Sequence, residues 1–432
     1  MVVLGNATTN LGTVAGLGQG RGSVEGLSVP GFPPADAIYG GNVDPLGANP
    51  GDDLDSSGEL RYLSIRHAGD EIGNSNELNG LTLAGVGSGT IVHHIEVYCN
   101  FDDGIEWFGG TVNGDHLQVA FAGDDTFDVD QGYRGTNQFL VGIMTFFNTE
   151  LAPPNAVYGS AGGDKGCECD GDDSDVLPAG NVNLNPTSVP ALQPTPFQNV
   201  NFYNFTIAGS RPSVTFNGHT NDNDGWEVRH GFAGSINNGL IYNTGGDGLG
   251  GAVGTQGLDV AANTVFPAAG STDWDILDNV IAGRVIANAI SCNNTRVLPA
   301  LSATAVERTV FTNGTLNNDS CTSGVNDPGF RLADGDTSFQ PKGVSGKLDA
   351  SLGSFDLRPQ LRNAVMAEGV SPAAPLDTTA TYRGAFDAVP AMWTDGWTVF
   401  SQAGMQPVPE PGMASMIVTG ALGLLAASRR RR

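Results

Sequence analysis

The clearest pattern in the chain is a short alternation of apolar and acidic positions that recurs at a fixed spacing. Segments beginning at Asp103, Asp125 and Asp224 each carry an acid three residues after the leading Asp and a glycine seven residues after it. The first two segments start 22 residues apart, and a weaker copy at 247–249 follows the third after 23 residues. A period in the low twenties, made of short strands and turns rich in Gly, Asn and Asp, is typical of parallel β-solenoids. We therefore predict an all-β protein, a right-handed parallel β-helix with coils of about 22 residues.

The alternation within each segment also predicts which side chains face the core. In a β-helix each strand lies about 4.8 Å above its counterpart in the preceding coil, so aligned positions form columns. Successive side chains of a strand point to opposite faces of the sheet. The apolar positions predicted to point inward are Ile105, Trp107, Phe127, Val129, Trp226 and Val228. The acidic positions predicted to point outward are Glu106, Asp128 and Glu227.

Similar strand patterns extend the β-helix body over residues 1–400. Further strands are predicted at 60–65, 81–83, 90–97, 116–121, 138–144, 200–207, 239–242 and 306–311. Between 148 and 197 the alternation stops and Pro, Gly and Asp dominate, which predicts one long loop inserted into a coil. Residues 363–400, with Trp393 and Trp397, are predicted to cap the C-terminal end of the stack, because an open solenoid end exposes unpaired strand edges. Residues 401–411 form a linker.

The composition suits a chain that turns often, and it excludes some partners. Glycine accounts for 62 of the 432 residues, and the formal net charge is −26. So acidic a chain repels nucleic acid, and we expect no nucleic-acid partner. Five cysteines cannot all pair within one chain, and Cys292 with Cys321 is the disulfide that we favour in an exported protein.

The C-terminal residues form a separate element. The sequence Val408-Pro409-Glu410-Pro411 precedes an apolar run over 412–428, and the chain ends in Arg429, Arg430, Arg431 and Arg432. As a helix the apolar run spans about 25 Å, which barely crosses a thin bilayer core. Arginines behind such a run favour the cytoplasmic side and leave the body outside. We therefore predict a transmembrane helix with a basic tail over 412–432.

These elements, in this order, resemble the PEP-CTERM sorting signal. In that family an exosortase-type membrane protease cuts near the Pro-Glu-Pro element and releases or re-anchors the exported body. The resemblance implies such a protease as a partner, and a location in the envelope, at the cell surface or in the extracellular matrix of a Gram-negative-type bacterium. An ordinary C-terminal tail anchor is the alternative. Because no basic, apolar leader opens the chain, we expect the true start and its secretion signal to lie upstream of Met1.

The body resembles a family of exported bacterial β-helix proteins of undefined activity. The resemblance is carried by NFDDGIEWFGG at 100–110, YRGAF at 382–386 and WTDGW at 393–397. It extends over most of residues 1–400. Relatives usually have another strand or two before a segment similar to residues 3–7, which again implies an upstream start. The resemblance implies the fold and leaves the reaction open.

Acids that align in neighbouring coils are costly, and the sequence offers two ways to offset the cost. Two unit charges about 5 Å apart repel by roughly 3 kcal/mol at an effective dielectric constant near 20. A calcium ion would relieve the repulsion, and its candidate oxygen ligands are Asp102, Asp103, Asp124, Asp125, Asp128 and Asp130. Alternatively, the leading Asp of each segment accepts amide hydrogens of a turn, which stabilises its ionised form without a metal.

An aromatic side chain beside carboxylates can stack on a sugar ring, which favours a binding role. The candidate ligand-binding residues are Glu106, Phe108, Asp128, Tyr133 and Glu227. We predict a non-catalytic exported protein, either structural or able to bind neutral glycans, matrix components or calcium.

Catalysis is the alternative function. A polysaccharide-degrading glycoside hydrolase would use a pair of carboxylates on neighbouring coils, such as Glu106 and Asp128. The histidines add no catalytic pattern, because no nucleophile motif accompanies them. The neighbours His93 and His94 lie in a predicted strand, so we expect one to point inward and the other outward.

Overall fold

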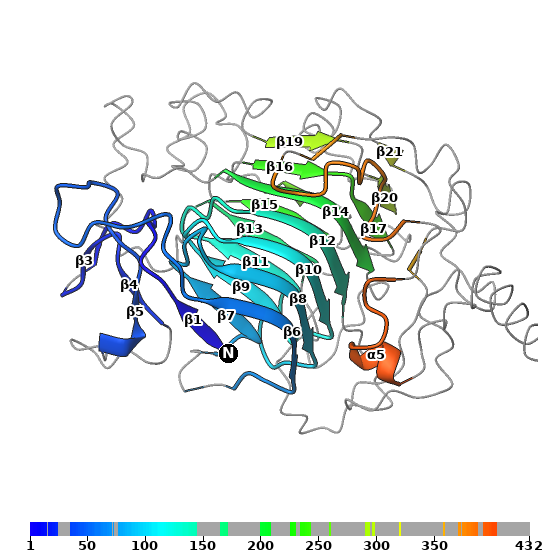
Figure 1. The fold of residues 1–432 in the computed structure, drawn as a ribbon, viewed down its shortest axis with the longest axis horizontal. Helices are drawn as coiled ribbons and strands as arrows, with labels where there is room; N and C mark the ends of the chain where they lie inside the picture. The colour runs from blue at the N-terminus through cyan, green and yellow to red at the C-terminus, as the bar shows by residue number, and fades with distance from the viewer. Residues whose placement is uncertain are drawn as a thin grey trace, which may run out of the picture.

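Most strands of the protein belong to two parallel sheets that lie opposite each other (Figure 1). The computed structural model describes residues 1–14, 16–24, 35–70, 72, 77–144, 165–171, 199–208, 225–229, 234–242, 259–260, 290–293, 296–298, 319–320, 357–358, 370–372, 374–387 and 392–403. Over most of these residues the chain alternates between the two sheets, so that successive strands belong to opposite walls. This architecture is the predicted all-β parallel β-helix.

Among the described residues, the two sheets contain seven and ten strands. The seven-stranded sheet has the order β1 (Val2–Leu4), β7 (Leu81–Ala84), β9 (Ile105–Phe108), β11 (Phe127–Asp130), β13 (Glu168–Asp170), β15 (Glu227–Arg229) and β18 (Asp259–Val260). The ten-stranded sheet has the order β21 (Asp319–Ser320), β20 (Arg296–Leu298), β17 (Leu240–Tyr242), β14 (Val200–Ala208), β12 (Thr136–Ile143), β10 (Asn113–Ala120), β8 (Ile91–Tyr98) and β6 (Glu59–Arg66); β16 (Gly234–Asn237) pairs with β14 and with β19 (Ile290–Asn293).

Smaller elements stand beside these sheets. Two short antiparallel pairs join β2 (Thr13–Val14) to β3 (Gly18–Gln19) and β4 (Gly22–Ser23) to β5 (Ile38–Tyr39). A 3-10 helix, η1, covers Ala35–Ala37, and the helix α5 covers Val399–Gln402.

The register of the strands follows the sequence repeat. Phe127 pairs with Ile105, and the two residues are 22 positions apart. In the other sheet Asp115 pairs with His93 at the same separation. Ile105 in turn pairs with Leu81, 24 positions earlier, because the turn between them is longer. The predicted coil length is therefore confirmed in the most regular part of the β-helix.

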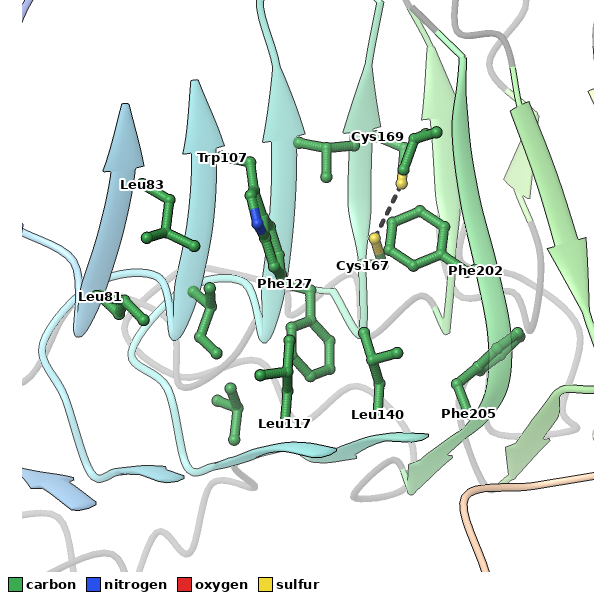
Figure 2. Packing of buried hydrophobic residues seen from close by; sticks show 14 of the residues in the cluster. Leu81, Leu83, Trp107, Leu117, Phe127, Leu140, Cys167, Cys169, Phe202 and Phe205 are labelled. Carbon is green, nitrogen blue, oxygen red and sulfur yellow. Dashed lines mark hydrogen bonds between the residues drawn. The ribbon is translucent and has the colours of Figure 1, made fainter. Parts of the chain in front are cut away.

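Inward-pointing side chains of both sheets form one continuous core (Figure 2). Trp107 and Phe127 from the seven-stranded sheet, with Leu117 and Leu140 from the ten-stranded sheet, are fully buried. Ile105, Val129 and Trp226 are also fully buried, as predicted, whereas the side chain of Val228 lies outside the described part. Because a cavity left by an aromatic side chain collapses only partly, Trp107→Ala is expected to cost about 3–5 kcal/mol.

The long strands of the ten-stranded sheet bend at a column of residues with positive φ. The column comprises Tyr62, His94, His116, Phe139, Asn204 and Asn238, and we call it the corner column. The ladder skips these residues, since Asp115 pairs with His93 and Leu117 with Ile95. The left-handed conformation costs roughly 1–2 kcal/mol for an ordinary residue, so contacts of the six side chains must offset it.

Residues 148–197 do not form the single uninterrupted loop that the sequence predicts. Glu168–Asp170 form β13, which pairs with β11 on one side and β15 on the other. Cys167 and Cys169 are buried in the core, with their Sγ atoms 2.9 Å apart (Figure 2). The prediction was wrong here because the strand has only three residues and lies within a run of Gly, Asp and Cys. Residues 148–164 and 172–197 of the predicted loop lie outside the described part.

The C-terminal residues of the body lie along the side of the β-helix. We call the described residues 370–372, 374–387 and 392–403 the C-terminal segment. The amide of Asn238 donates to the carbonyl of Val370, Gln138 and Asp377 exchange two hydrogen bonds, and the Val399 N–H donates to Glu96. Asn238 follows β16, Gln138 lies in β12 and Glu96 in β8, so the segment runs from a late coil back to an early one. The predicted cap across the end of the stack is therefore wrong.

The C-terminal segment lies along the side of the β-helix because the ten-stranded sheet has an apolar outer face there. The sequence repeat does not predict this apolar face. Tyr98, Ala120 and Ile143, at the ends of successive strands, are buried on the outer side of the ten-stranded sheet. Phe400 packs on them and is itself fully buried, with Trp393 at the margin of the same cluster. Burying apolar surface stabilises this arrangement by about 25 cal/mol per Å², which favours the side of the helix over its end.

The sorting elements and the disulfide partner lie outside the described residues. Residues 404–432 contain Val408, Pro409, Glu410, Pro411 and the four terminal arginines, and Cys321, the predicted partner of Cys292, is likewise not described. Across the described ranges we find no helix that is both long and apolar enough to span a membrane. The sorting signal, the transmembrane helix and the disulfide therefore stay predictions.

Candidate functional site

A ladder of acidic side chains runs across the outer side of the seven-stranded sheet. Glu106, Asp128, Glu168 and Glu227 occupy the same register position in β9, β11, β13 and β15. We call these four residues the acidic ladder. They alternate with the buried side chains of the core, which confirms that Glu106, Asp128 and Glu227 point away from it. The prediction missed Glu168, because β13 was not expected, and it missed Asp259 of β18, which pairs with Glu227.

The turns that precede these strands stack through their leading aspartates. Oδ1 of Asp103 accepts the backbone N–H of Asp125 at 2.8 Å, and Oδ1 of Asp125 accepts that of Lys165 at 2.6 Å. Hydrogen bonds of this kind favour an ionised carboxylate. The turn-amide alternative considered for the leading Asp is therefore present in two successive coils.

One lysine lies within the acidic ladder. Nζ of Lys165 is 2.6 Å from Oε1 of Glu168 and 3.4 Å from Oε2 of Glu227. At the other end, the side-chain amide of Asn79 donates to Glu106. Each of these ion-paired side chains is close to nine-tenths buried, so the charges are largely withdrawn from water. Removing any one of these charged side chains would leave its partners buried with an uncompensated charge.

Two acids of this outer face have a raised pKa. Burial raises the pKa of Asp103 well above its usual range, and the charges of Asp102 and Glu106 raise it further. Burial likewise raises the pKa of Asp128, together with the charges of Glu106, Asp103 and Glu168. Asp128 keeps some exposed surface, but its Oδ1 is buried and accepts no hydrogen bond. Asp128 therefore favours a bound proton or a nearby cation, whereas at Asp103 the hydrogen bond from the Asp125 amide opposes the effect of burial.

Carboxylate oxygens converge in three groups. Oxygens of Asp103, Glu106 and Asp128 lie within 4.8 Å of one another, as do those of Asp125, Asp128 and Glu168, and those of Asp102, Asp103 and Asp124. Five of the six predicted calcium ligands therefore come together. Asp130 is outside these groups, and its Oδ1 accepts the Gln131 N–H at 2.8 Å. The donor set is all oxygen, which suits a hard cation such as calcium.

A second cluster lies on the outer side of the ten-stranded sheet, in the corner column. Rings of Tyr62 and His94 stack at 4.4 Å, those of His94 and His116 at 4.4 Å, and those of His116 and Phe139 lie 4.7 Å apart. Trp393 crosses this stack, with its ring 5.0 Å from that of His116 and nearly perpendicular to it. Ring contacts of this kind contribute about 0.5–1.5 kcal/mol each, which helps to offset the left-handed backbone.

Asp115 joins two of the histidines. Its Oδ2 lies 2.8 Å from Nδ1 of His93, in hydrogen-bonding geometry. Its Oδ1 lies 2.6 Å from Nδ1 of His116, but out of line for a hydrogen bond, so we describe this contact as an ion pair. Burial opposes ionisation of Asp115, yet its close contacts with His116 and His93, and the charges of these histidines, lower its pKa. The carboxylate is therefore ionised and accepts the Nδ1 hydrogen of His93.

His94 has no such partner. Burial, and then the charges of His116 and His93, lower the pKa of His94 to about 4. Its imidazole is therefore neutral at pH 7 and keeps a free lone pair on one nitrogen.

A pocket opens beside this cluster, between the sheet and the C-terminal segment. Its volume is about 410 Å³. The wall on the sheet side comes from β10 and β12, and the opposite wall from the C-terminal segment. The lining residues are Asn113, Gly114, Asp115, His116, Gln138, Phe139, Pro375, Leu376, Asp377, Tyr382, Ala385, Phe386, Asp387 and Trp393. The C-terminal segment therefore turns an open sheet face into a concave site.

A family model described as the pectate-lyase-like β-helix domain matches residues 1–317 of the 432. The chain belongs to this family. Comparison with curated proteins and with solved structures gives no match. Membership in the pectate-lyase-like family agrees with the observed β-helix, but fold alone does not establish which reaction, if any, this member performs.

The aromatic residues predicted to bind a ligand on this β-helix are not available for it. Tyr133 is fully buried, stacks on Trp107 at 5.5 Å and donates its hydroxyl hydrogen to the Val112 carbonyl. Phe108 is partly buried and packs beside Tyr39, with ring centroids 6.0 Å apart. The prediction was wrong because Gln131 and Gly132 both have positive φ, so the chain reverses its alternation before Tyr133.

The histidine cluster is the part of the site that sequence reasoning missed. Alternation predicts opposite directions for His93 and His94, but the bend at His94 interrupts the alternation and both rings contact His116. A signal was present, because His94 and His116 are 22 residues apart, which is one coil of this pectate-lyase-like β-helix. Applying the repeat length to the histidines would have predicted that they stack.

Proposed function

We propose that the protein is a non-catalytic, exported β-helix that binds neutral glycans in the pocket beside the corner column. The observation that carries the proposal is the pocket itself, whose volume of about 410 Å³ is typical of small-molecule sites. The proposed glycan site therefore differs from the one predicted at Phe108 and Tyr133. It lies on the side of the β-helix that the C-terminal segment covers. Structural and binding roles are compatible, because the rigid coils hold the pocket in place.

The lining of the pocket suits a sugar. Trp393 and Phe386 stack at 5.4 Å, with their planes 25° apart, and Phe139 lies on the facing wall. Such rings pack against the apolar face of a pyranose, while amide and carboxylate groups receive its hydroxyls. Asp377 and Asp387 are among the acids that line the pocket. Because these acids, like the chain as a whole, carry negative charge, uronate polymers are disfavoured as ligands.

Calorimetry on the purified full chain tests this proposal. After a glycan-array screen, neutral oligosaccharides that score are titrated into wild type, Trp393→Ala and Trp397→Ala. The ring centroids of Trp397 and Trp393 are 6.5 Å apart, but Trp397 does not line the pocket, so Trp397→Ala is the matched control. We expect Trp393→Ala to weaken binding at least tenfold and Trp397→Ala to change it little. If no neutral glycan binds, or if both variants bind as wild type does, the proposal fails.

A calcium ion at the acidic outer face is a second proposed ligand. The observation in its favour is the pair of carboxylate groups that share Asp128, together with the raised pKa of Asp103 and Asp128. An ion with all-oxygen coordination would replace the protons that these acids otherwise favour. Calcium titration of EDTA-treated protein is expected to release heat with wild type and none with Asp128→Asn. Equal binding by both proteins would contradict an ion at this place.

Polysaccharide hydrolysis is the alternative function. Inverting glycosidases place their two carboxyl groups about 6.5–9.5 Å apart and retaining enzymes about 5–5.5 Å apart. In the group formed by Glu106, Asp128 and Asp103, the carboxylate oxygens approach within 4.8 Å, which is closer than the inverting arrangement requires and suits a shared cation. Release of reducing sugar from neutral polysaccharides, abolished by Glu106→Gln, would overturn the non-catalytic proposal.

Export and processing complete the proposal. The order Pro-Glu-Pro, apolar run and arginine tail supports cleavage by an exosortase-type protease. Intact-mass measurement of the protein recovered from the envelope or the medium is expected to show loss of the residues after the Pro409-Glu410-Pro411 element. Recovery of the full C-terminus, including Arg432, would instead indicate a tail anchor.

A further inference from the structure

We propose that His93, His94 and His116, held by Asp115, bind one divalent transition-metal ion of the zinc type. The two strands that supply these residues, β8 and β10, are neighbours in the ten-stranded sheet. One ring nitrogen from each histidine lies within 4.8 Å of the nitrogens of the other two. The inference does not depend on glycan binding, although Asp115 and His116 also line the pocket.

One buried imidazole nitrogen in this cluster, Nδ1 of His94, has no hydrogen-bond or ion-pair partner. Nδ1 of His116 also forms no hydrogen bond, but it lies 2.6 Å from Oδ1 of Asp115. His94 as a whole is only 9% exposed, so water does not readily satisfy this nitrogen. A buried polar atom without a partner destabilises the fold, and a coordinated metal ion would remove that cost.

Asp115 is positioned like the carboxylates that, in metal sites, accept a hydrogen bond from a metal-bound histidine and so orient its ring. It accepts the Nδ1 hydrogen of His93, which leaves Nε2 of that ring as the nitrogen that can coordinate a metal. Its second oxygen is 2.6 Å from Nδ1 of His116. One carboxylate therefore restrains two of the three rings, which lowers the entropy lost when an ion binds.

The chemistry of these donors differs from that of the acidic ladder. Three imidazole nitrogens suit zinc, copper or nickel, whereas the carboxylate groups of the ladder suit calcium. Zinc takes four ligands at about 2.0–2.2 Å from nitrogen or oxygen, so the three nitrogens must draw somewhat closer than 4.8 Å.

That closing motion is small. His94 and His116 stack with their planes 12° apart, so one ring must rotate about χ2 for both lone pairs to reach one ion. The χ2 torsion of histidine is broad, which makes such a rotation easy. The ring stacking lost in this rotation is weak compared with the ligation of a metal ion.

Zinc titration of the untagged, EDTA-treated full chain tests the inference. We expect one zinc ion per chain with micromolar or tighter affinity, and with cobalt in its place a visible absorption band of tetrahedral type. Trp393 and Trp397 lie 5.0–6.0 Å from the histidine rings, so bound copper is also expected to quench part of the tryptophan fluorescence.

Asparagine variants are expected to keep the fold intact. Asn204 and Asn238 occupy the same corner column with positive φ, so the column accepts asparagine. We expect His94→Asn/His116→Asn to weaken zinc binding at least 100-fold and to abolish the cobalt band. Asp115→Asn is expected to weaken binding about 10–100-fold and to retain the band, because Asp115 positions the rings. His67→Asn is the matched control, since His67 has a left-handed backbone and is not part of the cluster.

The outcomes separate this inference from the glycan proposal. Zinc is titrated without glycan, and glycan binding is measured in EDTA. The inference is overturned if wild type binds no zinc, or if His94→Asn/His116→Asn binds it as tightly as His67→Asn does. Loss of glycan binding with zinc binding intact would overturn only the proposed function.

Discussion

The outer side of the seven-stranded sheet and the corner column of the ten-stranded sheet are built by the same rule with opposite results. In each, side chains of one chemical kind, acids in the ladder and rings from Tyr62 to Phe139 in the column, recur at one position of successive coils, which places them about 4.8 Å apart. In the acidic ladder the neighbours are Glu106, Asp128, Glu168 and Glu227, which repel. In the corner column the neighbours are flat rings, which attract.

The difference shows that, in a solenoid, the interaction between two copies of a repeated residue is multiplied along the whole column. A column of carboxylates requires compensation by Lys165, by bound protons or by a cation. A column of rings is stable by itself and gathers a further layer, here Trp393 and the C-terminal segment. The first surface is therefore governed by charge, and the second by packing and by the nitrogens of its histidines.

The largest expected effect follows from removing the lysine of the acidic ladder. Lys165→Met leaves Glu168 and Glu227 buried without their cationic partner, which is expected to lower the free energy of unfolding by about 3–5 kcal/mol. Urea unfolding at pH 7 in EDTA measures the loss. Arg61→Met breaks an exposed ion pair with Glu59 and serves as control, with an expected loss below about 1 kcal/mol. Equal losses in the two variants would mean that the ladder is not governed by charge.

Removing one carboxylate from the ladder is expected to have the opposite sign. Asp128→Asn keeps the size of the side chain and abolishes its repulsion with Glu106 and Glu168. Because a pair of charges at this spacing repels by roughly 3 kcal/mol and protonation already relieves part of it, we expect a gain of about 1–2 kcal/mol in EDTA. A loss of stability measured by the same urea unfolding would show that the charge of Asp128 is compensated within the fold.

The two surfaces are expected to respond in opposite directions to acid. The folded-state pKa of Asp128 is raised, so its contribution to stability is fully present below pH 3.8 and is lost as pH rises through the folded pKa. The pKa of His94 is lowered to about 4, so its contribution is present above about pH 6.5 and is lost as pH falls toward 4. Between pH 7 and pH 5 the ladder gains stability while the corner column loses it.

Unfolding of metal-free protein at these two pH values separates the effects. The groups that face His94 are His93, His116 and Asp115, with the rings of Tyr62, Trp393 and Trp397. Relative to wild type, His94→Asn is expected to keep about 1 kcal/mol more of its stability at pH 5, after allowance for solvent screening. Asp128→Asn is expected to lack the gain on acidification. If His94→Asn and wild type change equally, the burial of that imidazole has no energetic consequence.

The sequence predicts the fold better than the sites, and particular residues show why. Trp107 and Val129 could be assigned to one column because both strands are four residues long and 22 residues apart. The three-residue strand at Cys169 carries no such pattern, because a short strand among Gly and Asp resembles a turn. Alternation fails wherever φ becomes positive, and this explains the errors at Tyr133 and His94.

The C-terminal segment was misplaced for a related reason. Its contacts with Asn204 and Asn238 join residues more than 130 positions apart in the chain, and no repeat connects them. A corner asparagine looks like any turn residue until the chain that covers it is known. The pocket, which needs both walls, therefore could not be predicted from either segment alone.

The central claim is that the two columns bind different classes of cation, and parallel melting experiments test it most directly. One EDTA-treated preparation each of wild type, Asp128→Asn and His94→Asn/His116→Asn is melted without metal, with calcium and with zinc. We predict that calcium raises the melting temperature of wild type and of the histidine double variant but not of Asp128→Asn, and that zinc raises that of wild type and of Asp128→Asn but not of the double variant. A zinc shift that survives in the double variant, or a calcium shift that survives in Asp128→Asn, would contradict the claim.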